Sequence, residues 1–349
     1  MTRIAVAISG GTDSLLSLLL LRESGAEVMA VHARFAPQAD AALDDQLRAL
    51  CEKLGIAWHV LDLRQEFERL VIAPFIAAYQ QGQTPNPCAL CNPAMKFGLL
   101  LDQALALGAT ALATGHYCRL EQRADGPCLG RGLDALKDQS YFLSLVPRER
   151  LRHVHFPLAA WTKDQACQAL AQRGLSAPVP AESQEICFIP HDYREFLRQR
   201  QVMLSGPGPI TLRDGTVLGR HAGLWNHTLG QRKGLGVAFT EPLYVLAKDH
   251  SGNRLIVGPK SQSLARTVRT GPPNFLRNPQ DWPAQVLVQT MYRQRPALAQ
   301  VQWNSNQGLN ITFDQPRPIA TPGQVAAVYS PDGDVLAGAL IVPEPLENS

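Results

Sequence analysis

The sequence predicts an α/β protein in which a parallel-sheet domain is followed by smaller β-rich modules. Over the first 120 residues, short apolar and β-branched runs alternate with helix-length amphipathic segments. Strands separated in this way need crossover connections, which predicts a parallel sheet with helices on both faces. From about residue 205, short alternating strands punctuated by Gly and Pro continue to the end. This change predicts one or two β-rich modules, with a seam near 260–280.

The elements of the first domain follow from the periodicity of apolar residues. Strands are expected at residues 3–9, 27–35, 58–64 and 109–117. Helices are expected at residues 12–25, 42–55 and 95–108, and further helical patterns cover residues 162–174 and 191–200. The first two helices end at Gly25 and Gly55, because glycine readily adopts the left-handed conformation that terminates a helix.

Composition indicates a folded protein of a reducing compartment. With 349 residues, 45% of them hydrophobic and 18% charged, the chain is long enough for two or three domains. The apolar run at 15–21 is too short to span a membrane and is followed by Arg22 and Glu23. Seven cysteines, an odd number, occur without a visible export signal, so we expect a cytoplasmic protein with no membrane partner.

The segment SGGTDS, residues 9–14, lies between the first strand and the first helix. Small residues at such a turn leave backbone N–H groups available to a phosphate, and the helix N-terminus adds a favourable dipole. Asp13 can cap the helix or help to hold Mg²⁺. The segment matches neither G-x-x-x-x-G-K-[ST] nor G-x-G-x-x-G. A glycine-rich turn that only caps a helix is the structural alternative.

The segment TPNPCALCNPAMKF, residues 84–97, contains a C-x-x-C pair, Cys88 and Cys91. Such a pair can form a disulfide, a metal site, a redox couple or a nucleophile that handles sulfur. The cysteines without a motif around them, Cys51, Cys118, Cys128 and Cys167, are interpreted as small buried apolar residues.

SGGTDS resembles the SGG-x-D-S loop of the ATP-pyrophosphatase (PP-loop) superfamily. The segments TPNPCALCNPAMKF, TGHYCRL, LKDQSYFLS, AESQEICFI and LGRHAGLWNHTLGQRKGLGVA follow in order. Together they resemble the tRNA-specific 2-thiouridylases of the MnmA type, from residue 3 to about residue 342. The resemblance implies a Rossmann-like PP-loop catalytic domain at 1–200, a central small β-rich domain at 201–270 and a tRNA-binding C-terminal β-barrel at 271–349.

The resemblance also implies ATP and Mg²⁺ as cofactors. The enzyme would transfer AMP to the C2 oxygen of the wobble uridine of tRNA, and a sulfur nucleophile would then expel AMP. The residues expected to bind the nucleotide are Ala7, Ile8, Ser9, Gly10, Gly11, Thr12, Asp13, Ser14, Ala33 and Gly115. Asp13 would act through Mg²⁺, and His116 is interpreted as a structural hydrogen-bonding residue.

Cys91 and Cys187 match the two catalytic cysteines of the family. In the reaction that the resemblance implies, one carries a persulfide and the other resolves it, with a disulfide bond as one state of the pair. Cys88 stands where the family usually has Asp, so an acid–base role at this position does not carry over. The substitution creates a third thiol. We therefore raise the hypothesis that Cys88, Cys91 and Cys187 bind a [4Fe-4S] cluster whose fourth iron is open to a sulfide.

Contacts with tRNA are expected from the resemblance at Asn86, Pro87, Cys88, Lys137, Asp138, Gln139, Tyr292 and Arg293. The stretch between residues 254 and 299 contains seven basic residues and one acidic residue, Asp281. This local excess of positive charge favours contact with phosphates. The target base is expected to flip out of its stack. Arg232 and Lys233 would contact RNA or brace the active-site loop.

The implied partners are the tRNAs for Lys, Glu and Gln, and a sulfur donor such as a cysteine desulfurase or a relay protein. Two other readings stay open from the sequence. One is a different PP-loop enzyme, an amidating ligase or synthetase. The other is a non-catalytic iron–sulfur or RNA-binding protein with a degenerate loop.

Overall fold

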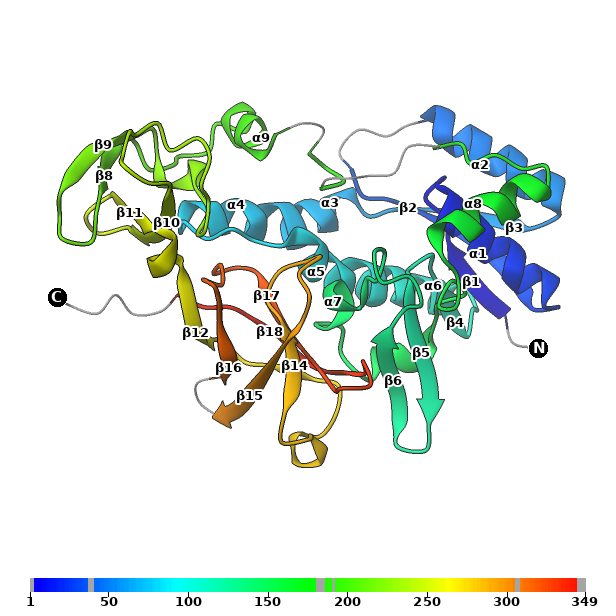
Figure 1. Cartoon of the computed structure of the whole chain (residues 1–349). Coiled ribbons are helices and arrows are strands. Elements are labelled where there is room, and N and C mark those ends of the chain that lie inside the picture. Colours follow the sequence, from blue (N-terminus) through cyan, green and yellow to red (C-terminus); the bar gives the residue numbers. More distant parts are fainter. Residues whose placement is uncertain (1–2, 37–40, 180–185, 190–191, 305–307, 344–349) are drawn as a thin grey trace.

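The first part of the chain forms a five-stranded parallel sheet, as the sequence predicts (Figure 1). A computed structural model describes residues 3–36, 41–179, 186–189, 192–304 and 308–343. The strand order is β3-β2-β1-β4-β7. These strands are β1 (Arg3–Ala7), β2 (Glu27–Arg34), β3 (Ala57–Asp62), β4 (Ala111–Ala113) and β7 (Val154–His155). All four pairings between neighbours are parallel, so every strand ends at the same edge.

Helices cover both faces of this sheet, because its strands are apolar on both sides. The core of one face joins Ile4 and Val6 to helix residues such as Leu15, Leu47 and Leu170. Its helices are α1 (Thr12–Glu23), α2 (Ala41–Leu54) and α8 (Lys163–Gln172). The opposite face is covered by α3 (Arg64–Phe67), η1 (Glu68–Ile72), α4 (Ala73–Gln80), α5 (Pro87–Cys91), η2 (Asn92–Leu100) and α6 (Leu101–Ala106).

Two stretches on that second face, η1 and η2, are π-helical. Each lies beside a proline: Pro74 follows η1 closely, and Pro93 is the second residue of η2. Proline has no N–H, and its ring collides with the carbonyl four residues earlier in an α-helix. A π-helical turn, in which hydrogen bonds join residues five apart, accommodates that missing bond. The residues that follow Cys91 therefore have a wider helical turn than the sequence pattern alone predicts.

Short elements connect this domain to the β-rich half of the chain. A hairpin of β5 (Cys118–Arg123) and β6 (Gly126–Arg131) is followed by α7 (Ser140–Leu143) and η3 (Arg150–His153). Helix α9 (Tyr193–Gln199) leads into a four-stranded sheet of order β10-β11-β8-β9. Its elements are β8 (Gly208–Thr211), β9 (Val217–His221), η4 (Leu224–Asn226), β10 (Leu243–Asp249) and β11 (Arg254–Pro259).

The last part of the chain is a seven-stranded sheet that curls into a half-barrel. Its order is β12-β16-β15-β14-β17-β18-β13. The Gly271 N–H donates to the Leu340 carbonyl at 2.8 Å, which joins the chain after β12 to the end of β18. The elements are η5 (Lys260–Ser263), β12 (Leu264–Arg269), β13 (Asn274–Phe275), η6 (Pro279–Asp281), β14 (Val286–Gln289), β15 (Ala297–Asn304), β16 (Gly308–Pro318), β17 (Val325–Tyr329) and β18 (Val335–Leu340).

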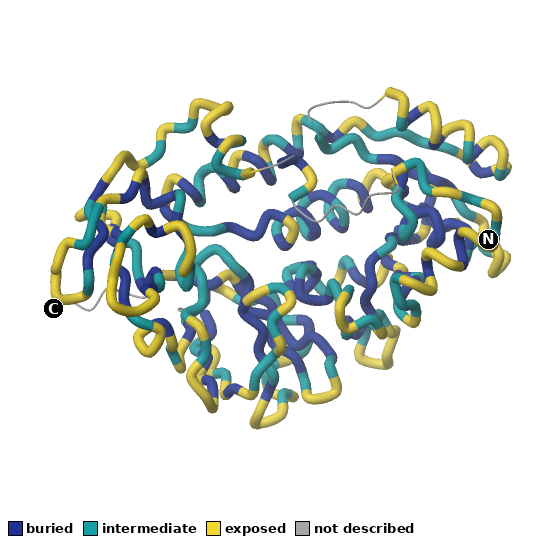
Figure 2. The backbone as a smooth tube through the Cα atoms, turned by 45° about the horizontal axis from the view of Figure 1, so that its top comes forward, coloured by how far each residue is buried: buried dark blue, intermediate teal, exposed yellow. Residues whose placement is uncertain are grey.

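The curled sheet packs directly on the helices beneath the parallel sheet. One hydrophobic core contains Phe97 and Tyr141 together with Val325, Ala327 and Tyr329 of β17. Figure 2 colours each residue by its burial and shows buried residues both in the helices and in the curled sheet. The Tyr141 hydroxyl donates to the Val325 carbonyl at 3.0 Å inside this core. Because the parallel-sheet domain and the curled sheet bury apolar side chains in this shared core, the core stabilises their relative position.

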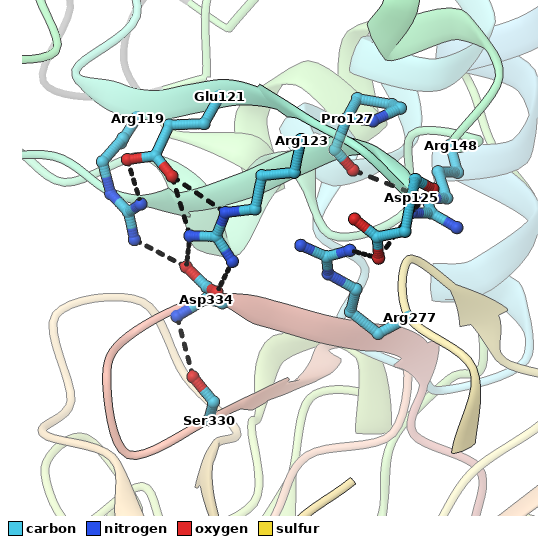
Figure 3. A network of polar contacts seen from close by, with 9 residues as sticks. All are labelled: Arg119, Glu121, Arg123, Asp125, Pro127, Arg148, Arg277, Ser330 and Asp334. Atoms are coloured by element: carbon cyan, nitrogen blue, oxygen red, sulfur yellow. Dashed lines mark hydrogen bonds and ion pairs between the residues drawn. The ribbon is translucent and has the colours of Figure 1, made fainter. Parts of the chain in front are cut away.

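An ion-pair network beside this core joins the β5–β6 hairpin to the turn before β18 (Figure 3). Arg119 and Arg123 each donate to the carboxylate of Asp334 at 2.6 Å. Asp334 is 9% exposed. Burial by itself would raise the pKa of Asp334, but hydrogen bonds from Arg123, Cys128 and Arg119 lower it overall. The carboxylate is therefore charged at neutral pH and links two segments more than 200 residues apart.

Replacing Asp334 by Asn is expected to lower the free energy of unfolding by about 1–2 kcal/mol, because two charge-assisted hydrogen bonds are lost at a buried carboxylate. Urea denaturation followed by tryptophan fluorescence measures this change. The matched control is Asp45→Asn, which removes an exposed pair with Arg48 on α2 and should leave stability almost unchanged. Equal effects of the two substitutions would contradict the assignment of this network to domain packing.

Candidate active site

The loop SGGTDS lies at the carboxyl end of β1, between the ends of β2 and β4. The Ser9 N–H donates to the Ser14 hydroxyl at 3.2 Å, and that hydroxyl donates to the Gly11 carbonyl at 2.9 Å. The loop is thus folded around Ser14. Gly11 is the N-cap of α1 and supplies no side-chain cap, so no side chain of this residue competes with an anion at the helix N-terminus.

The other residues expected to bind the nucleotide surround this loop. Ala7 and Ala33 lie at the ends of β1 and β2 and pack toward the same face of the sheet. Ile8 faces the opposite core, and its carbonyl accepts from His32 Nδ1 at 2.8 Å. Gly115 follows β4, and a Cβ atom there would lie 2.7 Å from the Asp13 carbonyl carbon. The structure therefore brings three strand ends together around small residues, where a nucleotide has room to approach the backbone.

Asp13 does not cap α1; its carboxylate is held by two other residues. Lys163 donates to its two oxygens at 2.8 and 2.9 Å, and the Tyr117 hydroxyl donates at 2.7 Å. Burial and the bond to Asp13 both raise the pKa of Tyr117, so its hydroxyl remains protonated as a donor. Lys163 is the first residue of α8, whose Thr162 forms a capping box with Gln165. A lysine is thereby fixed beside the nucleotide loop.

A pocket of about 430 Å³ opens beside the same loop. It joins the nucleotide loop to the segment expected to contact tRNA, since Thr12, Lys163 and Lys137 all line it. The remaining lining residues are Asp134, Leu136, Asp164 and Cys167. The two lysines are matched in number by Asp134 and Asp164, so the feature here that favours a phosphate is the N-terminus of α1 at Thr12.

The thiol loop, residues 84–91, continues into helices α5 and η2. Asn86 is the N-cap of α5 and accepts from the Ala89 N–H at 3.2 Å, and Pro87 occupies the first turn. This cap starts the helix immediately before the two cysteines, so Cys88 is exposed while Cys91 is buried. Cys187 is also exposed, and all seven cysteines are free thiols. The prediction that Cys167 is buried is wrong, because it lies on the exposed side of α8, whereas Cys51, Cys118 and Cys128 are buried as expected. Residues 181–185 of the AESQEICFI motif lie outside the described residues.

The three thiols of the motif lie close enough to influence one another's charge. The pKa of Cys91 is raised to about 12, chiefly by burial and to a smaller extent by Cys187 and Cys88, while the charge of Lys96 opposes the rise. Although Cys88 and Cys187 reach solvent, crowding by protein atoms also raises the pKa of each. The structure therefore brings Cys88, Cys91 and Cys187 into one neighbourhood. Each thiol is protonated at neutral pH.

Both β-rich units hold the thiol loop in place. The Thr84 N–H donates to the Pro322 carbonyl at 3.0 Å, and Gln324 Nε2 donates to the Thr84 carbonyl at 2.8 Å. From the central unit, Thr228 of the NHTLGQRKGLG segment lies 3.3 Å from the Thr84 hydroxyl. Lys248 donates to the Gly82 carbonyl at 2.9 Å, and its own burial lowers its pKa to about 8. The position of the thiols thus depends on all three units.

In the segment 137–139, Asp138 and Gln139 make hydrogen bonds that hold the loop. Asp138 accepts from the Ser140 hydroxyl at 2.8 Å and from the Gly132 N–H at 3.2 Å, and burial raises its pKa. Gln139 Oε1 accepts from the Tyr117 N–H at 3.0 Å. These bonds order the loop that places Lys137 in the pocket.

Tyr292 and Arg293 lie against helix α7, directly after the 137–139 segment. The Tyr292 ring is 4.3 Å from that of Phe142, and the Arg293 guanidinium lies 5.5 Å from the Tyr292 ring. Arg293 is exposed and has a φ of 62°. Within the basic stretch 254–299, Arg254 and Arg277 pair with Asp249 and Asp125. The exposed basic residues left for a polyanion are Lys260, Arg266, Arg293 and Arg295.

Three residues of the site, Lys163, Tyr117 and Lys96, are not predicted from the sequence. For Lys163 and Lys96, the sequence contains a feature that could have indicated a role in the site. Lys163 stands at the first position of a helix, where the dipole disfavours a cation. Lys96 is the one charge in the apolar run AMKFGLLL. In both cases a partner far along the chain explains the charge, and the sequence does not show that partner.

No group of three or more His, Cys, Asp or Glu side chains in the described part of the chain is arranged to hold a metal ion. Cys88, Cys91 and Cys187 therefore do not form a preformed ligand set for the [4Fe-4S] cluster of the hypothesis. Mg²⁺ makes a different demand, since it commonly takes one or two carboxylates plus phosphate oxygens of the substrate. Asp13 is the carboxylate at the phosphate loop that suits this role, and because both of its oxygens accept from Lys163 here, a bound Mg²⁺ would take the place of that lysine. None of the described helices is long and apolar enough to cross a membrane.

A strand–loop–helix phosphate site and a set of thiols in the same parallel α/β domain, followed by two β-rich units, are the features of an ATP-using enzyme of sulfur chemistry. Comparison with known proteins agrees with this class. Three family models match in order: a tRNA methyl transferase HUP domain at residues 2–191, a tRNA methyl transferase PRC-barrel domain at 194–259, and an aminomethyltransferase β-barrel domain at 265–341.

Curated relatives specify the family. A tRNA-specific 2-thiouridylase MnmA of Nitratidesulfovibrio vulgaris (strain Miyazaki F) is 52% identical and covers 97% of this chain and 99% of its own length. Those of Lawsonia intracellularis and Geobacter metallireducens are 46% and 40% identical, and each covers 97% of this chain and 98% and 96% of its own length, respectively. The chain belongs to the MnmA family of tRNA-specific 2-thiouridylases.

A solved structure, the U34-tRNA thiolase NcsA from Methanococcus maripaludis with its [4Fe-4S] cluster, is also similar. It is 15% identical and covers 57% of this chain and 65% of that chain. Its TM-score of 0.37 is too low to support an inference about the thiol site.

Proposed function

We propose that this enzyme replaces the C2 oxygen of the wobble uridine of tRNA by sulfur at the expense of ATP. The observation that carries the proposal is that a phosphate loop and three motif thiols lie in one domain, where the exposed Cys187 is close enough to raise the pKa of the buried Cys91. Membership of the MnmA family supports the same reaction, which makes the chain a transferase that modifies tRNA.

The first step would activate the base. The C2 oxygen attacks the α-phosphate of ATP, and the bond to pyrophosphate breaks. The loop from Ser9 to Ser14 and the helix dipole of α1 would stabilise the phosphates, and Lys163 would neutralise charge on the leaving pyrophosphate. Asp13 would hold Mg²⁺, which when bound neutralises charge on the phosphate oxygens. Ala7 and Ala33 are small and would leave room for the adenosine, and Gly115 lets the chain after β4 pack against the Asp13 backbone.

The second step would transfer sulfur. Cys187 is exposed and would receive a sulfur atom from a donor as a persulfide, whereas Cys91 is buried and would resolve it. The terminal sulfur attacks C2 and AMP leaves; Cys91 then attacks the sulfur of Cys187, which releases the 2-thiouridine and forms a disulfide. An external thiol reductant returns the pair to the free thiols. The donor we propose is a cysteine desulfurase, directly or through a relay.

The substrate would lie across the three units. Lys137 in the pocket, Tyr292 and Arg293 beside α7, and the exposed basic residues of the curled sheet would contact its backbone and bases. Asn86, Pro87 and Cys88 begin the helix that presents the thiols, so a base flipped toward them would meet Cys91 and Cys187. We propose the tRNAs for Lys, Glu and Gln as substrates.

The test is conversion of uridine to 2-thiouridine in unmodified tRNA, with ATP, a sulfur donor and the purified enzyme. Nucleoside mass spectrometry should detect the product, with AMP and pyrophosphate formed in equal amounts. Formation of an amide or of a charged tRNA in its place would identify a different PP-loop enzyme. Labelled pyrophosphate that fails to exchange into ATP with tRNA present would contradict an adenylating enzyme altogether.

Cys88 separates the two sulfur mechanisms. On the persulfide route, Cys88→Asp should retain activity within about tenfold, because this thiol neither carries nor resolves sulfur. Cys88→Ser gives the same-sized control without a charge. If Cys88→Asp loses activity as completely as substitutions at Cys91 and Cys187, and anaerobically purified enzyme contains stoichiometric iron and sulfide, the cluster hypothesis replaces the persulfide route.

A further inference from the structure

Lys96 occupies an unusual place for a cation. It lies on η2 between the fully buried side chains of Met95 and Phe97, and it is itself half-buried. It follows Cys91 by five residues, and hydrogen bonds in a π-helical stretch join residues five apart. The wider turn therefore carries Lys96 back toward the side of the helix on which Cys91 lies.

His116 holds the ammonium group of Lys96. Their Nζ and Nε2 atoms are 3.3 Å apart, and His116 Nδ1 lies 2.7 Å from the Thr114 hydroxyl. His116 is enclosed between the rings of Phe97 and Phe156, and burial lowers its pKa well below the ordinary value, so the imidazole is neutral. A neutral imidazole accepts at one nitrogen only. The arrangement that satisfies both contacts has Lys96 donating to Nε2 and Nδ1–H directed to Thr114.

The electrostatic environment of the thiols points to the same residue. Burial raises the pKa of Cys88, Cys91 and Cys187, and in each case the charge of Lys96 opposes that rise. Sulfur attacks as an anion, and the bond that Cys91 makes in resolving a persulfide requires its thiolate. A site that buries these groups needs a fixed positive charge to stabilise the anionic sulfur.

We propose that Lys96, positioned by His116, is the residue that stabilises anionic sulfur at Cys91 and Cys187. The proposal rests on the proposed sulfur transfer and adds a residue to it. In this proposal His116 is a positioning residue. The role at the thiols also explains why Lys96 occurs in the otherwise apolar helix η2.

The segment TGHY connects this arrangement to the nucleotide loop. Gly115 lies against the Asp13 backbone, and Tyr117 donates to the Asp13 carboxylate at 2.7 Å. Thr114 and His116, which alternate with these residues, hold Lys96. The segment TGHY thus positions both Asp13 at the phosphate loop and Lys96 at the thiols. The residues proposed for adenylation and for sulfur transfer are therefore held by the same four residues.

The experiment measures alkylation of the thiols by iodoacetamide, without ATP or tRNA, at one fixed pH near neutrality. In this reaction the thiolate displaces iodide, and the thiol proton passes to solvent. Peptide mass spectrometry follows Cys91 and Cys187, with the exposed Cys167 as an internal control. Lys96→Met should slow alkylation of Cys91 and Cys187 about tenfold or more, because a neighbouring opposite charge shifts a pKa by one to three units. Lys96→Arg should restore most of the rate, and Cys167 should not change.

His116 gives a second and independent variant. His116→Leu should slow alkylation of the same two thiols, whereas His116→Gln, which keeps an acceptor for Lys96, should slow it less. Unchanged alkylation of Cys91 and Cys187 in Lys96→Met would overturn the proposal, as would an equal slowing in Lys96→Arg. Exchange of labelled pyrophosphate into ATP is measured separately on wild type. Absence of that exchange counts against the proposed function, while the alkylation result still decides the role of Lys96.

Discussion

Replacing Cys187 or Cys91 by serine is expected to abolish 2-thiouridine formation, with a loss of at least about a thousandfold, while adenylation of tRNA continues. A hydroxyl cannot carry a persulfide or resolve one, so sulfur transfer stops. The phosphate loop and Lys163 belong to other elements and remain intact. The measurements are nucleoside mass spectrometry for the product and labelled pyrophosphate exchange for the first step.

The two serine variants should also fail differently. Incubated with a sulfur donor, Cys91→Ser should retain a persulfide on the exposed Cys187, whereas Cys187→Ser should accumulate none on the buried Cys91. The control is Cys51→Ser, at a buried thiol of α2 in the core on the other face of the sheet. A persulfide that accumulates on Cys91 would reverse the assigned roles. Normal thiolation by either variant would remove these cysteines from the mechanism.

Replacing Lys163 by Met is expected to slow adenylation about a hundredfold, the typical cost of losing one group that stabilises developing charge. In the free enzyme this lysine donates to both Asp13 oxygens, so its removal also leaves the carboxylate without its cation. Initial rates of AMP formation in the presence of tRNA measure the effect.

The control for Lys163 keeps the charge and changes the shape. Lys163→Arg should retain more activity than Lys163→Met, and Lys53→Met, on the exposed last turn of α2, should behave as wild type. Alkylation of Cys91 should be unchanged in Lys163→Met. A slower alkylation there would show that the substitution disturbs the whole domain and not the phosphate step.

Much of the fold follows from the sequence because its periodicity is strong. The parallel sheet, the helices after Gly11 and before Gly25 and Gly55, and the change to short strands in the second half were all predicted and are confirmed. The helices between Arg64 and Gln80 and the β5–β6 hairpin were not predicted. In the first case residues 70–79 are apolar on every side of a helix and contain Pro74, so they show no clean helical face.

The site was predictable where it is local. The phosphate loop is six consecutive residues whose composition already indicates an anion site. The contacts of Asp13 with Lys163 and Tyr117, and of Lys96 with His116, join residues between 20 and 150 positions apart. Such pairs arise from tertiary packing and leave no spacing in the sequence. The resemblance supplied the link between Cys91 and Cys187, which spacing alone could not have made.

The thiol loop is anchored at Thr84 by the curled sheet and by the central unit at once. The β-rich units are therefore poor candidates for exchange between related enzymes. A chimera that imports a foreign C-terminal unit to change tRNA preference would also import new partners for Thr84 and Asn86, and so would alter the chemistry along with the specificity. Segment 321–324 would have to be transplanted back from this chain for the two properties to be varied separately.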